Sequence, residues 1–343
     1  MSSAEERTRD ELHRSVVIWV GLLLLTLAAL FAAIGILNRE LYSAPSFVRL
    51  YLEAMQRHDV AAALATPGVE LTTDDRPGSG EASLLTPDAL GTLSELSLVS
   101  DTEIVPGRHR IVYSYRLTGA SERSTVAQTE FDVVQTGSSW LLFPEWRFVR
   151  SPTAHATVTV SHSDSFTAGS TQVVVDGDDT FHANRQYEVL VPSVFVLSHD
   201  SDYLGARAST LSVTTVRSTV SAIVDVRPTT AFLELVQGTV DGFLDDCAAQ
   251  KLLYPPGCPF GLDVNDRIAS EPAWSIEAYP SLTILAGQES WVVPSAAGSA
   301  RIRVDIRSLF DGTVSTRDES VPFDVSFALS IEPDGSIAFA PRA

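Results

Sequence analysis

An uninterrupted apolar stretch, Val16–Leu37, constrains most strongly what this chain can fold into. It contains no charged residue, and Thr26 carries its only hydroxyl group. A helix of about 22 residues rises about 33 Å, which is enough to cross a hydrocarbon core about 30 Å thick. Trp19 and Tyr42 lie near the two ends, where aromatic rings favour the membrane interface. The sequence therefore predicts one transmembrane helix over residues 16–37, with the lipid bilayer as its partner.

A cleaved signal peptide is the alternative to a permanent span. Its apolar region is normally about 7–15 residues long, shorter than this stretch. Ser43 and Ala44 offer small residues for cleavage, so this alternative stays open. No cysteine follows the stretch closely, which excludes a lipoprotein anchor.

The two flanking segments differ greatly in length. Residues 1–15 form a short polar tail, and the bulk of the 343 residues follows the stretch. Arginines lie on both sides, but long domains cross a membrane largely regardless of charge. We therefore expect a single-pass protein of the cell membrane with a cytoplasmic N-terminal tail and an extracytoplasmic bulk.

The charge balance excludes one class of partner. The chain has 43 acidic residues against 24 Lys and Arg, a formal net charge of −19. Nucleic acids and anionic lipid surfaces attract basic patches. We expect no nucleic-acid partner, and the length after the span predicts two or three domains.

Residues 45–150 predict an α+β domain. Pro45 suits a first helical turn, and Asp59 is a candidate N-cap for a short second helix. Over residues 110–117 the apolar period changes to two, which is typical of a strand with one buried face. Further strands follow over residues 126–149, so helices precede an antiparallel sheet.

The remainder divides at a change in periodicity. Ser151–Thr153 is predicted to be a linker, and β-branched residues then dominate residues 151–227, which indicates a small sandwich-like all-β module. Residues 228–343 begin with a helix and return to strands, which predicts a helix-plus-antiparallel-sheet domain. The expected buried stripe of that helix comprises Phe232, Val236, Val240, Phe243 and Cys247.

Several runs resemble known families. FVRLYLEAMQRHDVAAAL, followed by strands ending in SSWLLFPEWRFV, resembles a nuclear-transport-factor-two-like (NTF2-like) domain, also called a cystatin-like cone. This resemblance covers about residues 45–150 and implies a curved sheet around a long helix, with a conical pocket. VVVDGDDTF with YEVLVPSVF resembles PEGA-type surface modules.

The order of span, cone-like domain, β module and helix-sheet domain is similar to single-pass envelope proteins of the TcaA type and their actinobacterial relatives. FLDDCAAQKLLYPPGCPFG is the run most like that family. Its members often carry a zinc ribbon before the membrane, whereas this chain has no cysteine there.

An open cone would offer an aromatic pocket to an apolar or envelope-derived small ligand. The alternative is that the same rings fill the cone. The candidate ligand-binding residues are Tyr51, Tyr113, Tyr115, Phe131, Trp140 and Trp146.

Catalytic and metal-binding patterns are weak. Glu130 and Asp132 share one face of a strand, which indicates solvent-facing acids, and His58 precedes the Asp59 cap. The acidic turns at residues 176–179 and 200–202 lack the spacing of a calcium loop. We expect no enzyme activity, no metal and no cofactor.

Cys247 and Cys258 are the only cysteines. Cys247 falls near the end of the expected helix, and the run Tyr254–Gly257 lets the chain double back. An even pair in an oxidising compartment predicts a disulfide. A zinc site would need more ligands, and Asp245 and Asp246 disfavour a reactive thiolate.

Together these features predict a non-enzymatic, membrane-anchored extracytoplasmic protein that binds or senses cell-envelope components, such as an envelope polymer or a membrane-protein partner. The alternative is a small-molecule binding protein or enzyme that uses the cone pocket. A structural stalk or assembly factor would have the same sequence features.

Overall fold

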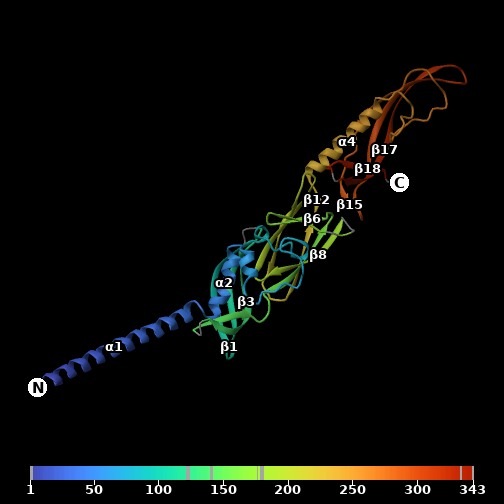
Figure 1. Ribbon diagram of the computed structural model, residues 1–343. Coiled ribbons are helices and arrows are strands. Elements are labelled where there is room, and N and C mark those ends of the chain that lie inside the picture. Colours follow the sequence, from blue (N-terminus) through green and yellow to red (C-terminus); the bar gives the residue numbers. More distant parts are fainter. Residues whose placement is uncertain are drawn as a thin grey trace.

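A computed structural model describes residues 3–120, 124–139, 142–175, 177, 181–332 and 334–341, with side chains between Trp19 and Ala340. The molecule is elongated: α1 extends alone from one end, and the long strands β16 and β17 reach the other (Figure 1). Its helices are α1 (Ser3–Glu40), α2 (Ala44–Gln56), α3 (Val60–Leu64) and α4 (Thr230–Ala248), with 3-10 turns at Gly80–Ala82 and Pro87–Ala89.

The apolar stretch lies within α1. Over Trp19–Glu40 the mean hydropathy is 2.7, and none of these residues is buried inside the protein. This helix is long and apolar enough to cross a membrane, a property that it shares with a signal sequence. Ser43 then caps α2, where its Oγ accepts a hydrogen bond from the N–H of Ser46 (3.4 Å).

In the first domain α2 lies against an antiparallel sheet with the strand order β1-β2-β3-β4. Val48, Tyr51 and Met55 of α2 are buried at helical spacing. In β2 the odd positions from Ile111 to Leu117 are buried, as the alternation predicts. Register shifts interrupt the pairing of β1 with β2, which bends the sheet. The strands are β1 (Thr92–Val105), β2 (Arg108–Thr118), β3 (Ser124–Ser139) and β4 (Phe143–Phe148).

The middle module consists of two facing sheets, in the orders β12-β10-β9-β6-β7 and β11-β5-β8. Phe166 of the first sheet meets Tyr187 of the second, with ring centroids 5.9 Å apart. This contact joins the two sheets through their buried faces. The strands are β5 (Thr153–Ser161), β6 (Ser165–Ala168), β7 (Thr171–Val174), β8 (His182–Leu190), β9 (Ser193–Asp200), β10 (Leu204–Val213), β11 (Thr219–Asp225) and β12 (Arg227–Pro228).

The first domain and the middle module share a buried boundary. Glu188 of β8 is 2% exposed, and its Oε2 accepts hydrogen bonds from the N–H groups of Thr72 (2.8 Å) and Thr73 (3.0 Å). The N–H of Gly91 donates to the carbonyl of Val194 (2.7 Å). Because an unpaired polar group would be costly at a buried boundary, these bonds tie the two parts together.

The expected linker Ser151–Thr153 is packed rather than free. Thr153 is buried and begins β5. The carbonyl of Pro152 accepts a hydrogen bond from the N–H of Val191 (2.8 Å). Serine and proline favour loops, which is why the sequence predicts a linker. In the structure this segment is held against the turn between β8 and β9.

In the C-terminal domain α4 lies against a sheet in the order β13-β16-β17-β18, where β14 and β15 also pair with β16. Thr229 caps α4, and its Oγ1 accepts from the N–H of Phe232 (3.2 Å). The strands are β13 (Arg267–Ile268), β14 (Ala273–Ala278), β15 (Leu285–Ala286), β16 (Trp291–Arg307), β17 (Val314–Ile331) and β18 (Ile337–Pro341).

The prediction that Phe243 belongs to the buried stripe of α4 is wrong. Phe243 is 45% exposed, and Leu244 is fully buried in its place. Leu244 lies four residues after Val240, and an interval of four keeps a side chain on the same helical face about as well as an interval of three. Contact with the sheet therefore decides which of the two side chains is buried, because the sequence spacing allows either.

Candidate functional site

Four of the predicted pocket residues are buried in the first domain. Tyr51 and Phe131 lie with their ring centroids 6.2 Å apart, and Phe148 packs against both. The hydroxyl of Tyr51 donates to the carbonyl of Val191 in the middle module (2.8 Å). The exposed fractions are 0% for Tyr51, 4% for Tyr113, 1% for Tyr115 and 2% for Phe131. This side-chain packing favours the alternative that the rings fill the interior of the first domain, and ligand binding by them stays a prediction.

Of the two predicted tryptophans, the structure describes Trp146. Trp146 lies in the second half of β4, where its Nε1–H donates to the carbonyl of Tyr42 (2.8 Å). Its ring meets His109 edge-on at 5.2 Å. Trp140 lies outside the described residues. Trp146 therefore contacts the end of α1 and is partly buried at the margin of the core that contains Tyr51.

The buried Tyr115 gives a prediction at high pH. Burial raises the pKa of its hydroxyl to about 12, which outweighs the lowering by its hydrogen bond with Thr129. A tyrosine in the unfolded chain has a pKa of about 10. The native protein therefore keeps a proton that the unfolded chain loses. Its contribution to stability is complete below about pH 10 and is lost between about pH 10 and pH 12, at about 1.4 kcal/mol per pH unit.

Urea unfolding of the full chain in detergent micelles at a series of alkaline pH values would measure this effect. The variant Tyr115→Phe should show a shallower loss of stability with pH than the unmodified chain. Some slope should remain, because burial also raises the pKa of Tyr51. Equal slopes for the two proteins would contradict the prediction.

The acidic residues predicted on the solvent face of β3 are not all solvated. Asp132 is 8% exposed and lies 3.2 Å from Nη2 of Arg108 and 3.3 Å from Nε of Arg110. Glu130 contacts Nε of the same Arg110 at 2.8 Å. The cross-strand register puts Arg110 opposite Asp132, so the basic side chains of β2 cover it. Asp59 has the predicted role, because its Oδ1 accepts the N–H of Ala62 (3.0 Å).

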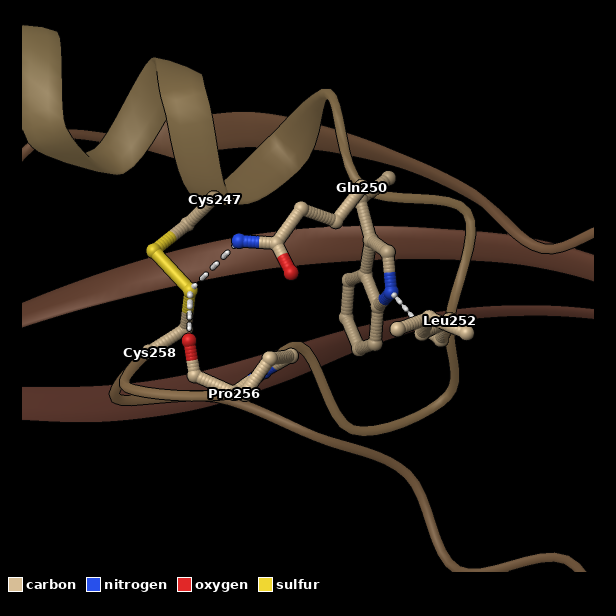
Figure 2. Close-up of a disulfide and its surroundings, with 6 residues drawn as sticks. Cys247, Gln250, Leu252, Pro256 and Cys258 are labelled. Atoms are coloured by element: carbon tan, nitrogen blue, oxygen red, sulfur yellow. Dashed lines mark hydrogen bonds between the residues drawn. A yellow bond between two sulfur atoms is a disulfide. The ribbon is translucent and has the colours of Figure 1, made fainter.

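Cys247 and Cys258 form a disulfide with their Cα atoms 5.8 Å apart (Figure 2). The bond joins the end of α4 to the loop that returns toward the sheet. Nε2 of Gln250 lies 3.6 Å from Sγ of Cys258, and the indole N–H of Trp274 donates to the carbonyl of Leu252 (2.8 Å). The disulfide therefore closes a loop that is itself attached to β14.

A cavity of about 600 Å³ lies where the middle module meets the C-terminal domain. One wall is aromatic: the ring of Trp291 lies 5.4 Å from that of His162 and 5.5 Å from that of Phe181. Nδ1 of His162 is 3.1 Å from the carbonyl of Val226, which orients its ring. A second cavity, of about 520 Å³, also has His162 and Trp291 in its lining.

Four carboxylates line the larger cavity, from Asp164, Asp200, Asp202 and Glu289. Among the residues that the structure describes, none of these four forms an ion pair with arginine or lysine, and no such residue lines the cavity. Unpaired acids around one hollow produce a negative potential there. The arrangement suits a ligand that carries amine or guanidinium groups, for which the ring of Trp291 offers a further contact.

Sequence reasoning missed this site. Its residues come from β6, β9, β16 and β17, which are far apart in the chain. The acidic turn at residues 200–202 was visible only as a turn, and the other turn, at residues 176–179, lies largely outside the described residues. Within the described chain no group of three or more His, Cys, Asp or Glu side chains could hold a metal ion.

A third cavity, of about 500 Å³, is apolar and lies between α4 and the sheet. The exposed Phe243 lines it together with Val240, Phe327 and Phe339. This position explains how a large ring on α4 avoids the core and still contacts apolar neighbours.

Comparison with known proteins adds little. No protein-family model matches the chain, and no curated protein matches it. Among solved structures the chain is similar to an "Ntf2 like protein involved in plasmid conjugation", with 9% sequence identity over 74% of this chain and 78% of that chain, and a TM-score of 0.13. A TM-score this low carries no argument about fold or function, so what is established is an N-terminal apolar helix followed by a mostly β body with a few helices.

Proposed function

We propose that this chain is a non-enzymatic, single-pass membrane protein whose bulk lies outside the cytoplasm and binds a cell-envelope component or a partner protein. The exposed apolar window of α1 supports membrane anchoring. The disulfide supports an oxidising compartment, where such bonds persist. In this proposal the first domain is an NTF2-like cone and the whole chain is similar to TcaA-type envelope proteins.

The cavity between the middle module and the C-terminal domain is the binding site in this proposal, and it is the observation that carries the binding function. Its volume of about 600 Å³ lies within the range of small-ligand sites, which often form between domains. The lining combines aromatic rings with unpaired carboxylates. The ligand class that fits is a cationic group, such as a basic peptide segment or an amine-bearing polymer.

The alternative, a small-molecule enzyme or binding protein that uses the cone, has less support. Tyr51, Tyr115 and Phe131 are buried, and the hydroxyl of Tyr51 is already bonded to the middle module. A cone filled in this way leaves these rings little surface for a ligand.

A binding titration tests the proposal. The full chain in detergent micelles is titrated with a tetra-arginine peptide, and with tetra-glutamine as the neutral probe. We expect binding of tetra-arginine alone, with an affinity that falls as salt rises, because the attraction is electrostatic. The double variant Asp200→Asn/Asp202→Asn should bind at least several-fold more weakly, since it removes two of the four lining carboxylates.

A matched control removes the same charge elsewhere. Asp74→Asn/Asp246→Asn changes two exposed acids outside the cavity and should bind tetra-arginine as the unmodified chain does. Equal weakening in both double variants would mean that only the net charge of −19 matters. That result, or no binding of tetra-arginine at all, would reject the cavity as a cation site.

A further inference from the structure

The end of α1 is attached to the hairpin formed by β3 and β4. Nδ2 of Asn38 donates to the carbonyl of Leu142 (2.8 Å). The indole N–H of Trp146 donates to the carbonyl of Tyr42 (2.8 Å), and the rings of Tyr42 and Phe143 lie 4.4 Å apart. A transmembrane helix that ended in a free linker would have none of these bonds. Here the helix end and the hairpin form one unit, so the hairpin stays beside α1.

The hydrogen bond of Asn38 also sets the level of the hairpin along the helix axis. Asn38 is the first residue after the apolar stretch, so it lies about 1.5 Å beyond Leu37 along the axis. Leu142, which it bonds, lies close to the same level. If α1 crosses the bilayer, this level is the interface between hydrocarbon and headgroups.

Several exposed side chains at this level are apolar, beside the exposed charged side chains of Arg39 and Glu40. Leu41 is 60% exposed, Leu142 is 43% exposed and Tyr42 is 40% exposed. Together with Phe143 we call these residues the junction collar. Aromatic and aliphatic side chains of this kind favour the interface, where tyrosine keeps its hydroxyl in water. They lie beside the span, which identifies a bilayer as the surface that covers them.

We propose that the junction collar is inserted in the interface of the bilayer that α1 crosses, so that the first domain rests on the membrane in a fixed orientation. This inference rests on the proposed membrane anchoring and adds a second contact with lipid. The strongly acidic body gains nothing from anionic headgroups. The contact proposed here is the collar, and the rest of the elongated body continues beyond it, away from α1 (Figure 1).

Fluorescence quenching by lipid tests this arrangement. Both native cysteines are in the disulfide. A single added cysteine therefore provides one free thiol for labelling. The full-length variants Leu142→Cys, Leu30→Cys and Leu309→Cys are labelled with one fluorophore. They are reconstituted in phosphatidylcholine vesicles that contain a lipid with a quencher near the top of its acyl chain.

Leu30 lies inside the apolar stretch and reports the span, and Leu309 lies in the turn between β16 and β17 at the far end of the molecule. We expect quenching at positions 142 and 30, and several-fold less quenching at position 309. Quenching at position 30 without quenching at position 142 would overturn the collar but not the anchor. No quenching at position 30 would overturn the membrane anchor itself, and the collar with it.

Discussion

The variant Tyr51→Ala is expected to lower the free energy of unfolding of the first domain by about 3–5 kcal/mol, as for other large aromatic side chains removed from a core. Tyr51 is fully buried and packs against Phe131 and Phe148. Alanine would leave a cavity and would also leave the carbonyl of Val191 without its donor. Urea unfolding of the full chain in detergent micelles, monitored by near-ultraviolet circular dichroism, measures the loss.

The matched variant Tyr51→Phe separates the ring from the hydroxyl. Phenylalanine keeps the ring contacts and removes only the hydrogen bond to Val191, so a loss of about 1 kcal/mol is expected. The difference between the two variants is then the contribution of the ring. A small effect of Tyr51→Ala would instead mean that the ring lines an open pocket, as the alternative function requires.

Loss of the disulfide is expected to lower the free energy of unfolding of the C-terminal domain by about 3 kcal/mol in the chain-entropy model. Cys247 and Cys258 are separated by 11 positions, and the closed loop is attached to the sheet. Phe260, just beyond the loop, is buried against Trp274 and Phe323 at ring distances of 4.9 Å and 5.4 Å. Without the bond the unfolded chain would gain conformational entropy, whereas the folded loop would not. The unfolded state would therefore become more favourable.

The measurement compares urea unfolding of the oxidised chain with that of the double variant Cys247→Ser/Cys258→Ser. A reducing agent should destabilise the unmodified chain and leave the double variant unchanged. Equal stability of the oxidised chain and the variant would contradict the prediction.

The only lysine offers a direct check of the disulfide between Cys247 and Cys258. Lys251 is exposed and lies inside the closed loop. After cleavage by a lysine-specific protease, the two fragments should stay together without reductant and separate with it. Fragments that separate without reductant would show that the bond is absent.

Short-range signals predicted much of the local structure. Asp59 and Thr229 begin helices as caps because their side chains reach N–H groups three residues ahead. The alternation over residues 110–117 placed the correct face of β2 inward. The length and composition of the apolar stretch suit a membrane span. A helix is the structure that bonds all of its own backbone polar groups there. The cysteines could pair because the intervening run contains the prolines and the glycine of a turn.

The candidate site could not be predicted in the same way. The cavity gathers Asp200 from β9, and Asp164 and Glu289 from two loops, and only the packing of the middle module against the C-terminal domain brings them together. The residues next to an acid in the sequence do not indicate whether it will share a cavity with an aromatic ring from a distant part of the chain. The aromatic set was visible in the sequence, but whether its rings line a pocket or fill the first domain depends on how closely the middle module covers them.

By itself, the sequence determined the apolar helix, the change from helical to strand periodicity, the caps and the pair of cysteines, because each depends on one short continuous segment of the chain. Only the tertiary structure decided that Leu244 and not Phe243 is buried, that Asp132 is covered by arginines, and that Asn38 bonds Leu142. These outcomes depend on which distant surface meets each side chain, and that surface exists only after the sheets have formed.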